Sequence, residues 1–214
     1  MEPSFWHDRW ESNQIGFHEG QPNPLLVAHI DTLGLKPGAR VFVPLCGKTA
    51  DIPWLLDRGF RVAGAELSEI AVSQLFESLG HLPTITAADD TEHHAGDDID
   101  IFVGDIFDLT AAQLGPVDAV YDRAALVAMP DAMRARYAAH LIALTDGAPQ
   151  LLITYEYDQN ALNGPPFSVG EDIVRGLYER VYQLDMIVGE AVAGGFKGGH
   201  PAVERLWRLR PRVS

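Results

Sequence analysis

The sequence is short of the features that mark several large classes of protein. Its 214 residues include a single cysteine, Cys46, so no disulfide can form within the chain and a reducing compartment fits best. No apolar run approaches the roughly 20 residues that a membrane-spanning helix needs. The polar, acidic start of the chain is unlike a signal peptide. We therefore expect a cytoplasmic protein that does not enter a membrane.

Basic residues are also scarce, because 16 Lys and Arg stand against 30 Asp and Glu and leave a formal net charge of −14. Proteins that bind nucleic acid concentrate positive charge, so this balance argues against a nucleic-acid partner. It mildly favours a cationic ligand, although such a charge also serves solubility alone. The length suits one domain over residues 1–214 with a substantial core.

Familiar catalytic signatures are missing: there is no G-x-S-x-G, H-E-x-x-H, P-loop or C-x-x-C. Cys46 has no histidine where the sequence would place a base, so we interpret it as a packing residue rather than a nucleophile. His93 and His94 lie among acidic residues, but adjacent ligands with no partner set at a defined spacing are a weak metal signal. We predict no metal site, and we expect residues 83–98 to form an acidic insert, either an exposed loop or a short hairpin.

What the sequence does contain is an alternation of apolar strands and amphipathic helices. Strands are expected from Val41 to the turn at Gly47 and over 61–67, 99–104, 117–122, 150–157, 182–191 and 203–209. Helices are expected over 25–33, 50–57, 69–79, 131–144 and 169–181. This order predicts an α/β sandwich with a mostly parallel seven-stranded sheet. The last two strands are joined without a helix, so the final strand should insert antiparallel.

Ligands of such sheets bind beyond the carboxyl ends of the strands. The residues at those ends are Leu45, Cys46 and Gly47, then Glu66, then Asp105 and Ile106, and finally Asp122 and Arg123. The spacing from Gly47 to Glu66 suits an acid that meets the hydroxyl pair of a ribose. Only one glycine of the G-x-G-x-x-G fingerprint is present, so the pattern indicates a nucleoside site and no more.

Several of these residues have a structural interpretation as well as a functional one. Glu66 either accepts hydrogen bonds from a ribose or completes the cap of the helix that follows it. Arg123 either clamps a carboxylate or forms an ion pair with Asp105 or Asp122. Trp10 shares a helix face with a second tryptophan four residues earlier, and the pair covers either the protein's own core or a flat ligand.

The ordered set of motifs resembles the thiopurine S-methyltransferase family. The motifs are W-x-x-x-W near the start, P-L-C-G-K, E-L-S-E, D-I-F-D, Y-D-R-A-A-L-V-A and N-G-P-P-F, which run from Trp6 to Phe167. The resemblance implies a Rossmann-like class I methyltransferase, built as a three-layer sandwich, that uses S-adenosylmethionine. It also implies methyl transfer to the sulfur of thiopurines or related aromatic thiols by a monomeric cytoplasmic enzyme.

The resemblance also implies site residues. In the order of the chain, Trp10 covers the cofactor, Phe17 lines the acceptor pocket, Leu45 and Gly47 form the turn under the methionine part, Glu66 binds the ribose, Ile106 holds the adenine, and Arg123 lies at the cofactor and acceptor end. Residues 1–24 would act as a lid, and N-G-P-P-F would form part of the pocket wall. An aromatic thiol ionises readily, so a general base is optional, and Asp122 or a water is the candidate.

Other functions remain to be weighed against this one. A nicotinamide-dependent reductase of the same topology is disfavoured, because the glycine fingerprint is incomplete and no Tyr-x-x-x-Lys pair occurs. The acceptor could instead be a selenium or tellurium species or another thiol. A cofactor-binding module without thiol turnover is the non-enzymatic alternative.

Overall fold

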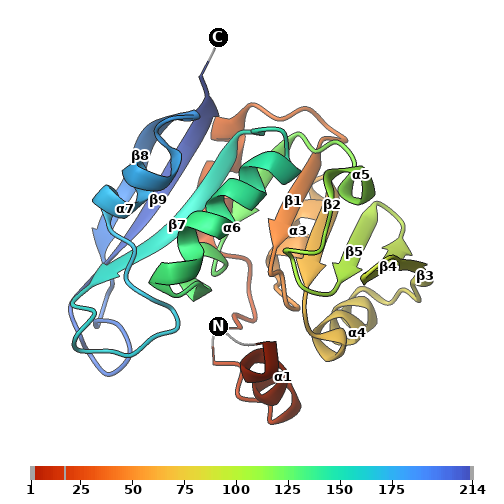
Figure 1. The fold of residues 1–214 in the computed structure, drawn as a ribbon, viewed down its shortest axis with the longest axis horizontal. Coiled ribbons are helices and arrows are strands. Elements are labelled where there is room, and N and C mark those ends of the chain that lie inside the picture. Colours follow the sequence, from red (N-terminus) through yellow and green to blue (C-terminus); the bar gives the residue numbers. More distant parts are fainter. Residues whose placement is uncertain (1–2, 17, 213–214) are drawn as a thin grey trace. The chain divides into compact units, whose positions relative to one another are not determined.

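The computed structural model describes residues 3–16 and 18–212 (Figure 1). Phe17, which the family resemblance assigns to the acceptor pocket, lies outside the described residues. The chain divides into two compact units, residues 1–120 and residues 121–214, and the boundary falls inside strand β6 (Ala119–Asp122). The single-domain organisation that the length suggested therefore stays a prediction. Within the described residues, no helix is both long and apolar enough to cross a membrane.

The first unit combines short helices with the parallel part of the sheet. Its helices are α1 (Pro3–Glu11), α2 (Pro24–His29), the 3-10 helix η1 (Ile30–Leu33), α3 (Asp51–Asp57), α4 (Glu69–Leu79) and α5 (Ala111–Leu114). Its strands before β6 are β1 (Arg40–Pro44), β2 (Arg61–Glu66), β3 (Thr84–Ala88), β4 (Thr91–Gly96) and β5 (Ile99–Val103).

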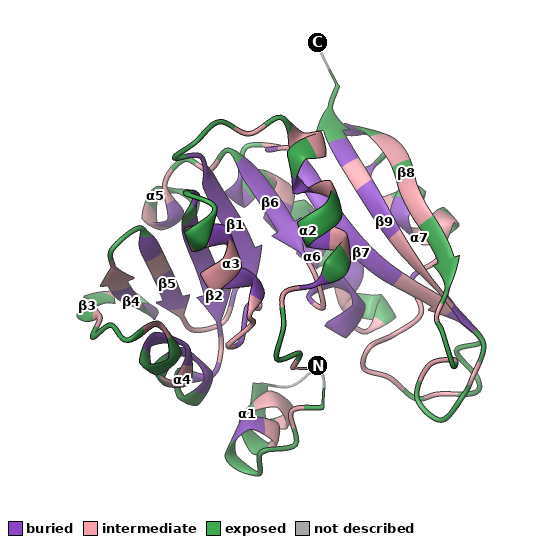
Figure 2. Cartoon of the chain, turned by 180° about the vertical axis from the view of Figure 1, so that it is seen from behind, coloured by how far each residue is buried: buried purple, intermediate pink, exposed green. Residues whose placement is uncertain are grey.

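Strands β1, β2 and β5 form the parallel centre of this unit, in the order β3-β4-β5-β2-β1. The first two residues of β6 pair with β1 on its other side, also in parallel. All of β1 is buried, as is β2 after its first residue, which Figure 2 shows in purple. Strands covered on both faces need apolar side chains throughout, which is why the runs at 41–43 and 62–65 identified them.

Residues 83–98 contain a hairpin, which is the second of the two forms expected for the acidic insert. Strand β3 pairs antiparallel with β4, and β4 pairs antiparallel with β5, across a turn in which Asp89 has a φ of 52°. The charged composition left a loop and a hairpin open, and the hairpin satisfies the backbone of β4 by pairing it with the buried strand β5. The hairpin adds two strands to the seven expected, giving nine in the part of the chain that the structure describes.

The second unit holds the 3-10 helix η2 (Leu126–Ala128), α6 (Asp131–Leu144), β7 (Gln150–Tyr157), α7 (Glu171–Tyr178), β8 (Tyr182–Ala191) and β9 (Ala202–Pro211). Strand β9 lies between β7 and β8 and is antiparallel to both, which confirms the expected direction of the last strand. Large aromatic side chains fill the interior, namely Tyr137, Tyr178, Tyr182 and Trp207. The indole N–H of Trp207 donates to Thr154 at 3.1 Å, so this buried donor is satisfied.

Candidate functional site

Three parallel strands of the first unit end at one edge of the sheet. The register pairs Ala65 of β2 with Pro44, the last residue of β1, and pairs Glu66 with Val103, the last residue of β5. The segments that leave these ends are therefore neighbours in space although they lie far apart in the chain. They carry four predicted site residues, which are Leu45, Gly47, Glu66 and Ile106.

The turn after β1 has an unusual backbone. Leu45 has a φ of 49° and Gly47 a φ of 53°, so two of its residues lie in the left-handed region. For leucine this conformation costs about 1–2 kcal/mol, and such strain gathers where a ligand or a close approach requires it. The amide of Cys46 donates to the Ala65 carbonyl at 3.1 Å, which ties the turn to β2.

Trp10 of α1 lies against this turn. Its side chain is 6% exposed, and a Cβ atom added at Gly47 would stand 3.1 Å from Cζ2 of the indole. A side chain at position 47 would therefore crowd the indole, and glycine also tolerates the positive φ. The structure brings these two predicted residues together, while the covering of a cofactor by Trp10 stays a prediction.

Glu66 ends β2 with its carboxylate buried and 7% of the residue exposed. One carboxylate oxygen accepts the Gly47 amide at 2.8 Å, and the other accepts the Ser68 amide at 2.8 Å. Burial raises the pKa of Glu66, and these backbone hydrogen bonds oppose that rise. The carboxylate thus bridges the turn after β1 and the start of α4, whose N-cap is Ser68. The structural and the functional interpretation of Glu66 are therefore compatible. Its carboxylate accepts the amide of the N-cap residue Ser68 and can still accept hydrogen bonds from a ligand.

The residues around Glu66 fit the ribose of a nucleoside cofactor. An ionised carboxylate has about four acceptor positions, and two backbone amides use two of them. The Leu67 amide also favours the ionised form, and the carboxylate keeps acceptor capacity for hydroxyl groups of a ribose. The absence of a side chain at Gly47 provides the close approach to the backbone that a bound cofactor needs.

Cys46 behaves as a packing residue. It is 5% exposed, and a Cβ atom added at Gly64 of β2 would stand 2.9 Å from its Sγ. Burial and the nearby Glu66 carboxylate raise the pKa of the thiol well above its ordinary value. Because the thiolate is the nucleophilic form, this environment keeps Cys46 unreactive.

Ile106 follows β5 in a tight turn and is 6% exposed. The Asp105 carboxylate accepts the Phe107 amide at 3.0 Å, so this aspartate stabilises the turn. The Gly104 amide donates to the Glu66 carbonyl at 2.9 Å, which fixes the turn beside the end of β2. Ile106 thus presents an apolar side chain from the segment that leaves β5 next to Glu66.

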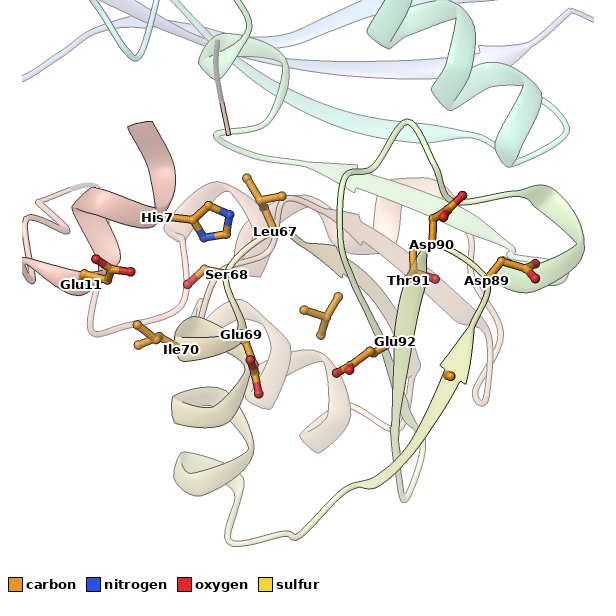
Figure 3. A pocket seen from close by; sticks show the side chains of 12 residues that line it. His7, Glu11, Leu67, Ser68, Glu69, Ile70, Asp89, Asp90, Thr91 and Glu92 are labelled. Carbon is orange, nitrogen blue, oxygen red and sulfur yellow. The ribbon is translucent and has the colours of Figure 1, made fainter. Parts of the chain in front are cut away.

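A cavity of about 600 Å³ is lined by Leu67 and Ser68, the two residues that follow Glu66 in the chain. Figure 3 shows His7 and Glu11 of α1 on one side, Asp89 to Glu92 of the hairpin on the other, and Leu67 and Ser68 between them. Leu67 and Val103 supply apolar surface, whereas the hairpin and α4 supply carboxylates. The acidic hairpin therefore lines a cavity, which its sequence did not indicate.

Each histidine of the pair on β4 lies beside a carboxylate. His94 is 2% exposed, so it does not lie in an exposed loop, whereas the His93 side chain is 28% exposed. Nε2 of His93 lies 2.8 Å from the Asp100 carboxylate, whose other oxygen meets the Arg40 guanidinium at 2.7 Å. These two partners lower the pKa of Asp100 against the opposing effect of burial. In residues 3–16 and 18–212, no three His, Cys, Asp or Glu side chains are grouped to hold a metal ion.

In the second unit, Asp122 is completely buried at the end of β6. Its carboxylate accepts the Leu126 amide at 3.0 Å and the Tyr137 hydroxyl at 2.8 Å, and burial raises its pKa to about 6. Both oxygens are thus engaged by the fold, one by η2 and one by α6. Sequence reasoning missed Tyr137 as this partner, and the only available signal was its place on the apolar face of the expected helix.

Arg123 comes directly after Asp122 and is half-buried. Ala124 then takes a φ of 64°, which turns the chain sharply into η2. The Phe167 amide donates to the Val127 carbonyl at 2.6 Å, so the N-G-P-P-F segment packs against η2. The structure therefore places this segment in the same unit as Arg123 and close to the short helix that follows it.

Solved structures of low sequence identity share this fold. The 1,6-didemethyltoxoflavin-N1-methyltransferase of Burkholderia thailandensis, crystallised with S-adenosylhomocysteine, matches with a TM-score of 0.65 at 16% identity over 97% of this chain and 87% of that one. The magnesium protoporphyrin IX methyltransferase of Synechocystis PCC 6803 matches with a TM-score of 0.61 at 17% identity over 98% and 100%. The fold is therefore that of the class I methyltransferases, with a mixed sheet, a parallel core and antiparallel C-terminal strands, as predicted.

Curated relatives are much closer in sequence. A thiopurine S-methyltransferase of Xanthobacter autotrophicus is 59% identical over 210 residues, which is 98% of this chain and 99% of that protein. One of Teredinibacter turnerae is 49% identical over 214 residues and 100% of both chains. The family model of the thiopurine S-methyltransferases matches residues 1–205, and this chain belongs to that family.

Proposed function

We propose that this chain transfers the methyl group of S-adenosylmethionine to the sulfur of a thiopurine or a related aromatic thiol. The family supplies the reaction, because full-length relatives at 49–59% identity are thiopurine S-methyltransferases. The buried Glu66 carboxylate, held between the amides of Gly47 and Ser68, is the observation on which the cofactor site rests.

The cofactor contacts follow from the arrangement around Glu66. Its remaining lone pairs would accept the ribose hydroxyls, and the turn at Leu45 and Gly47 would meet the methionine part. Ile106 would contact the adenine, as the family resemblance implies, from the turn that the Gly104 amide fixes beside the end of β2. Arg123 would lie at the cofactor and acceptor end, as the family resemblance implies.

The first 24 residues would form the lid, and Asn23 would be its fixed end. The Asn23 side chain accepts the Leu25 amide at 2.9 Å, and its own amide donates to Asp51 at 2.6 Å, so the chain is anchored there. Trp10, upstream of this anchor, would cover the cofactor from its present position over Gly47. Such a cover excludes water from the reacting groups.

Bound S-adenosylmethionine supplies a methyl group on a positively charged sulfur. The chain's own contribution is to hold the two reactants in line, which is worth up to about 7–11 kcal/mol of the barrier. An aromatic thiol ionises readily near neutral pH, so a dedicated base is optional. Asp122 has both oxygens engaged by Leu126 and Tyr137, so we assign it the positioning of η2 rather than proton removal.

The family resemblance further supports a monomeric cytoplasmic enzyme with a small-molecule acceptor and no nucleic-acid partner.

An acceptor screen tests the whole proposal. Purified protein is incubated with radiolabelled S-adenosylmethionine and, separately, 6-mercaptopurine, thiophenol, selenite and tellurite. We expect methylated thiol product, whereas label transferred only to the selenium or tellurium species would overturn the acceptor assignment. Binding of NAD without S-adenosylmethionine in a calorimetric titration would contradict the cofactor.

A further inference from the structure

The connector between β8 and β9 is a built loop whose role the reaction does not yet explain. The amide of Phe196 donates to the His200 carbonyl at 2.7 Å, and the reverse bond is 2.9 Å, so the two residues pair. Gly195 has a φ of 78°, and a Cβ atom added there would stand 2.5 Å from the carbonyl carbon of Gly199. The backbone at Gly195 lies so close to the backbone at Gly199 that only glycine fits at position 195. The loop therefore has a defined shape.

This loop presents Phe196 to the end of β7. The ring of Phe196 is stacked on Tyr155 at a centroid distance of 5.0 Å and on Tyr157 at 5.6 Å. The two tyrosines are two residues apart on β7, so their side chains lie on the same face of the sheet. Their hydroxyls are anchored, since Tyr155 donates to Glu204 at 2.8 Å and Tyr157 to the Pro166 carbonyl at 2.6 Å. Phe196 is half-buried, and we call the three stacked rings of Tyr155, Tyr157 and Phe196 the platform.

The platform is joined to the end of β6 through contacts within the second unit. Lys197 donates to the Pro165 carbonyl, and the Phe167 amide two residues later donates to the Val127 carbonyl of η2. The Leu126 amide of η2 in turn donates to Asp122. Residues at the carboxyl ends of β6 and β7 are thus coupled to the connector, and ligands of α/β sheets bind at such ends.

We propose that Phe196 is the stacking face that selects aromatic thiols as methyl acceptors. This inference rests on the proposed function, because it names the contact by which that function recognises its acceptor. A flat, polarisable ring gains from stacking on an aromatic face, whereas a saturated ring of the same size does not. The Lys197 ammonium lies 6.0 Å from the Phe196 centroid, and its positive charge suits an acceptor that reacts as a thiolate.

The test compares an aromatic and a saturated acceptor of equal ring size, thiophenol and cyclohexanethiol. Each is measured as a substrate or, where turnover is absent, as a competitive inhibitor against 6-mercaptopurine. In Phe196→Leu we expect the KM of thiophenol to rise about tenfold, which corresponds to about 1.4 kcal/mol. The constant for cyclohexanethiol and the Kd for S-adenosylhomocysteine should change less than twofold. Phe196→Tyr, which keeps the ring, should restore the wild-type KM.

Leu82→Ala provides a control, because Leu82 is 97% exposed in the first unit and should change none of these values. Thermal unfolding checks that each variant folds, and Phe196→Met replaces the leucine variant if that one does not. The role of Phe196 would be overturned if the leucine variant left the KM of thiophenol unchanged, or if it weakened binding of thiophenol and cyclohexanethiol equally. It would also be overturned if the tyrosine variant raised the KM of thiophenol as much as the leucine variant. A wild-type protein that methylates no thiol would instead refute the proposed function.

Discussion

Removal of the Glu66 carboxylate tests the placement of the cofactor most directly. Its two oxygens accept the amides of Gly47 and Ser68, and the proposed cofactor site adds the two ribose hydroxyls to the same carboxylate. A hydrogen bond to a charged group contributes about 1.5–3 kcal/mol, so two of them contribute about 3–6 kcal/mol. At about 1.4 kcal/mol for each factor of ten, Glu66→Ala should raise the Kd for S-adenosylhomocysteine at least about 100-fold.

The assay is calorimetric titration of folded protein with S-adenosylhomocysteine. Glu77→Ala is the matched control, because Glu77 is exposed on α4 away from the residues that line the cavity, and its removal changes the net charge equally. The 2′-deoxyribose analogue of the ligand gives a sharper comparison. It should bind the wild type at least about tenfold more weakly than the parent ligand, since it lacks one charged hydrogen bond. It should bind Glu66→Ala with little further loss.

The placement would be wrong if Glu66→Ala bound within threefold of the wild type, or if it and Glu77→Ala lost equal affinity. Loss of the carboxylate also leaves the amides of Gly47 and Ser68 without their acceptor. Each such buried amide costs about 1–3 kcal/mol of folding free energy. Thermal unfolding of the variant must therefore accompany the titration, so that affinity is compared only between folded proteins.

Three further predictions concern Asp122, Cys46 and Gly47. The pKa of Asp122 is about 6 in the fold against an ordinary 3.8, so folding favours its protonated form and stability should fall by about 3 kcal/mol in total as pH rises from below 3.8 to above 6. The free energy of unfolding of Asp122→Asn, measured with denaturant, should not show this dependence on pH. If this variant lost more than tenfold of its thiol turnover at pH 7.5, the result would contradict a positioning role for Asp122. Native protein should resist iodoacetamide at Cys46, whose thiol pKa is raised well above the ordinary value, and Cys46→Ala should keep its turnover. Gly47→Ala should weaken S-adenosylhomocysteine binding at least tenfold, because the new methyl group meets the Trp10 ring at 3.1 Å in a left-handed backbone. Titration of the double variant with Trp10→Phe should recover part of that loss, and no recovery would show that the backbone strain alone is responsible.

The sequence predicted most of the fold because the decisive signals are local. Alternating apolar strands and helices define the parallel core, and α4 spans residues 69–79 as expected, between Ser68 and Gly80. The hairpin at 84–96 was harder to predict, since its acidic composition resembles a loop and its pairing partner β5 follows it in the chain. Strand pairing depends on the neighbour as much as on the strand itself, and local composition does not report the neighbour.

The sequence by itself determined the fold class, the family motifs and the acid at the end of β2. Periodicity and motif order are properties of the chain, so they need no coordinates. Only the tertiary structure decided what surrounds that acid. The amides of Gly47 and Ser68 that hold Glu66, the Trp10 ring over the turn and the Tyr137 hydroxyl on Asp122 are contacts between segments that no local pattern connects. The same holds for Phe196, whose stacking on β7 turned a glycine-rich connector into a candidate recognition element.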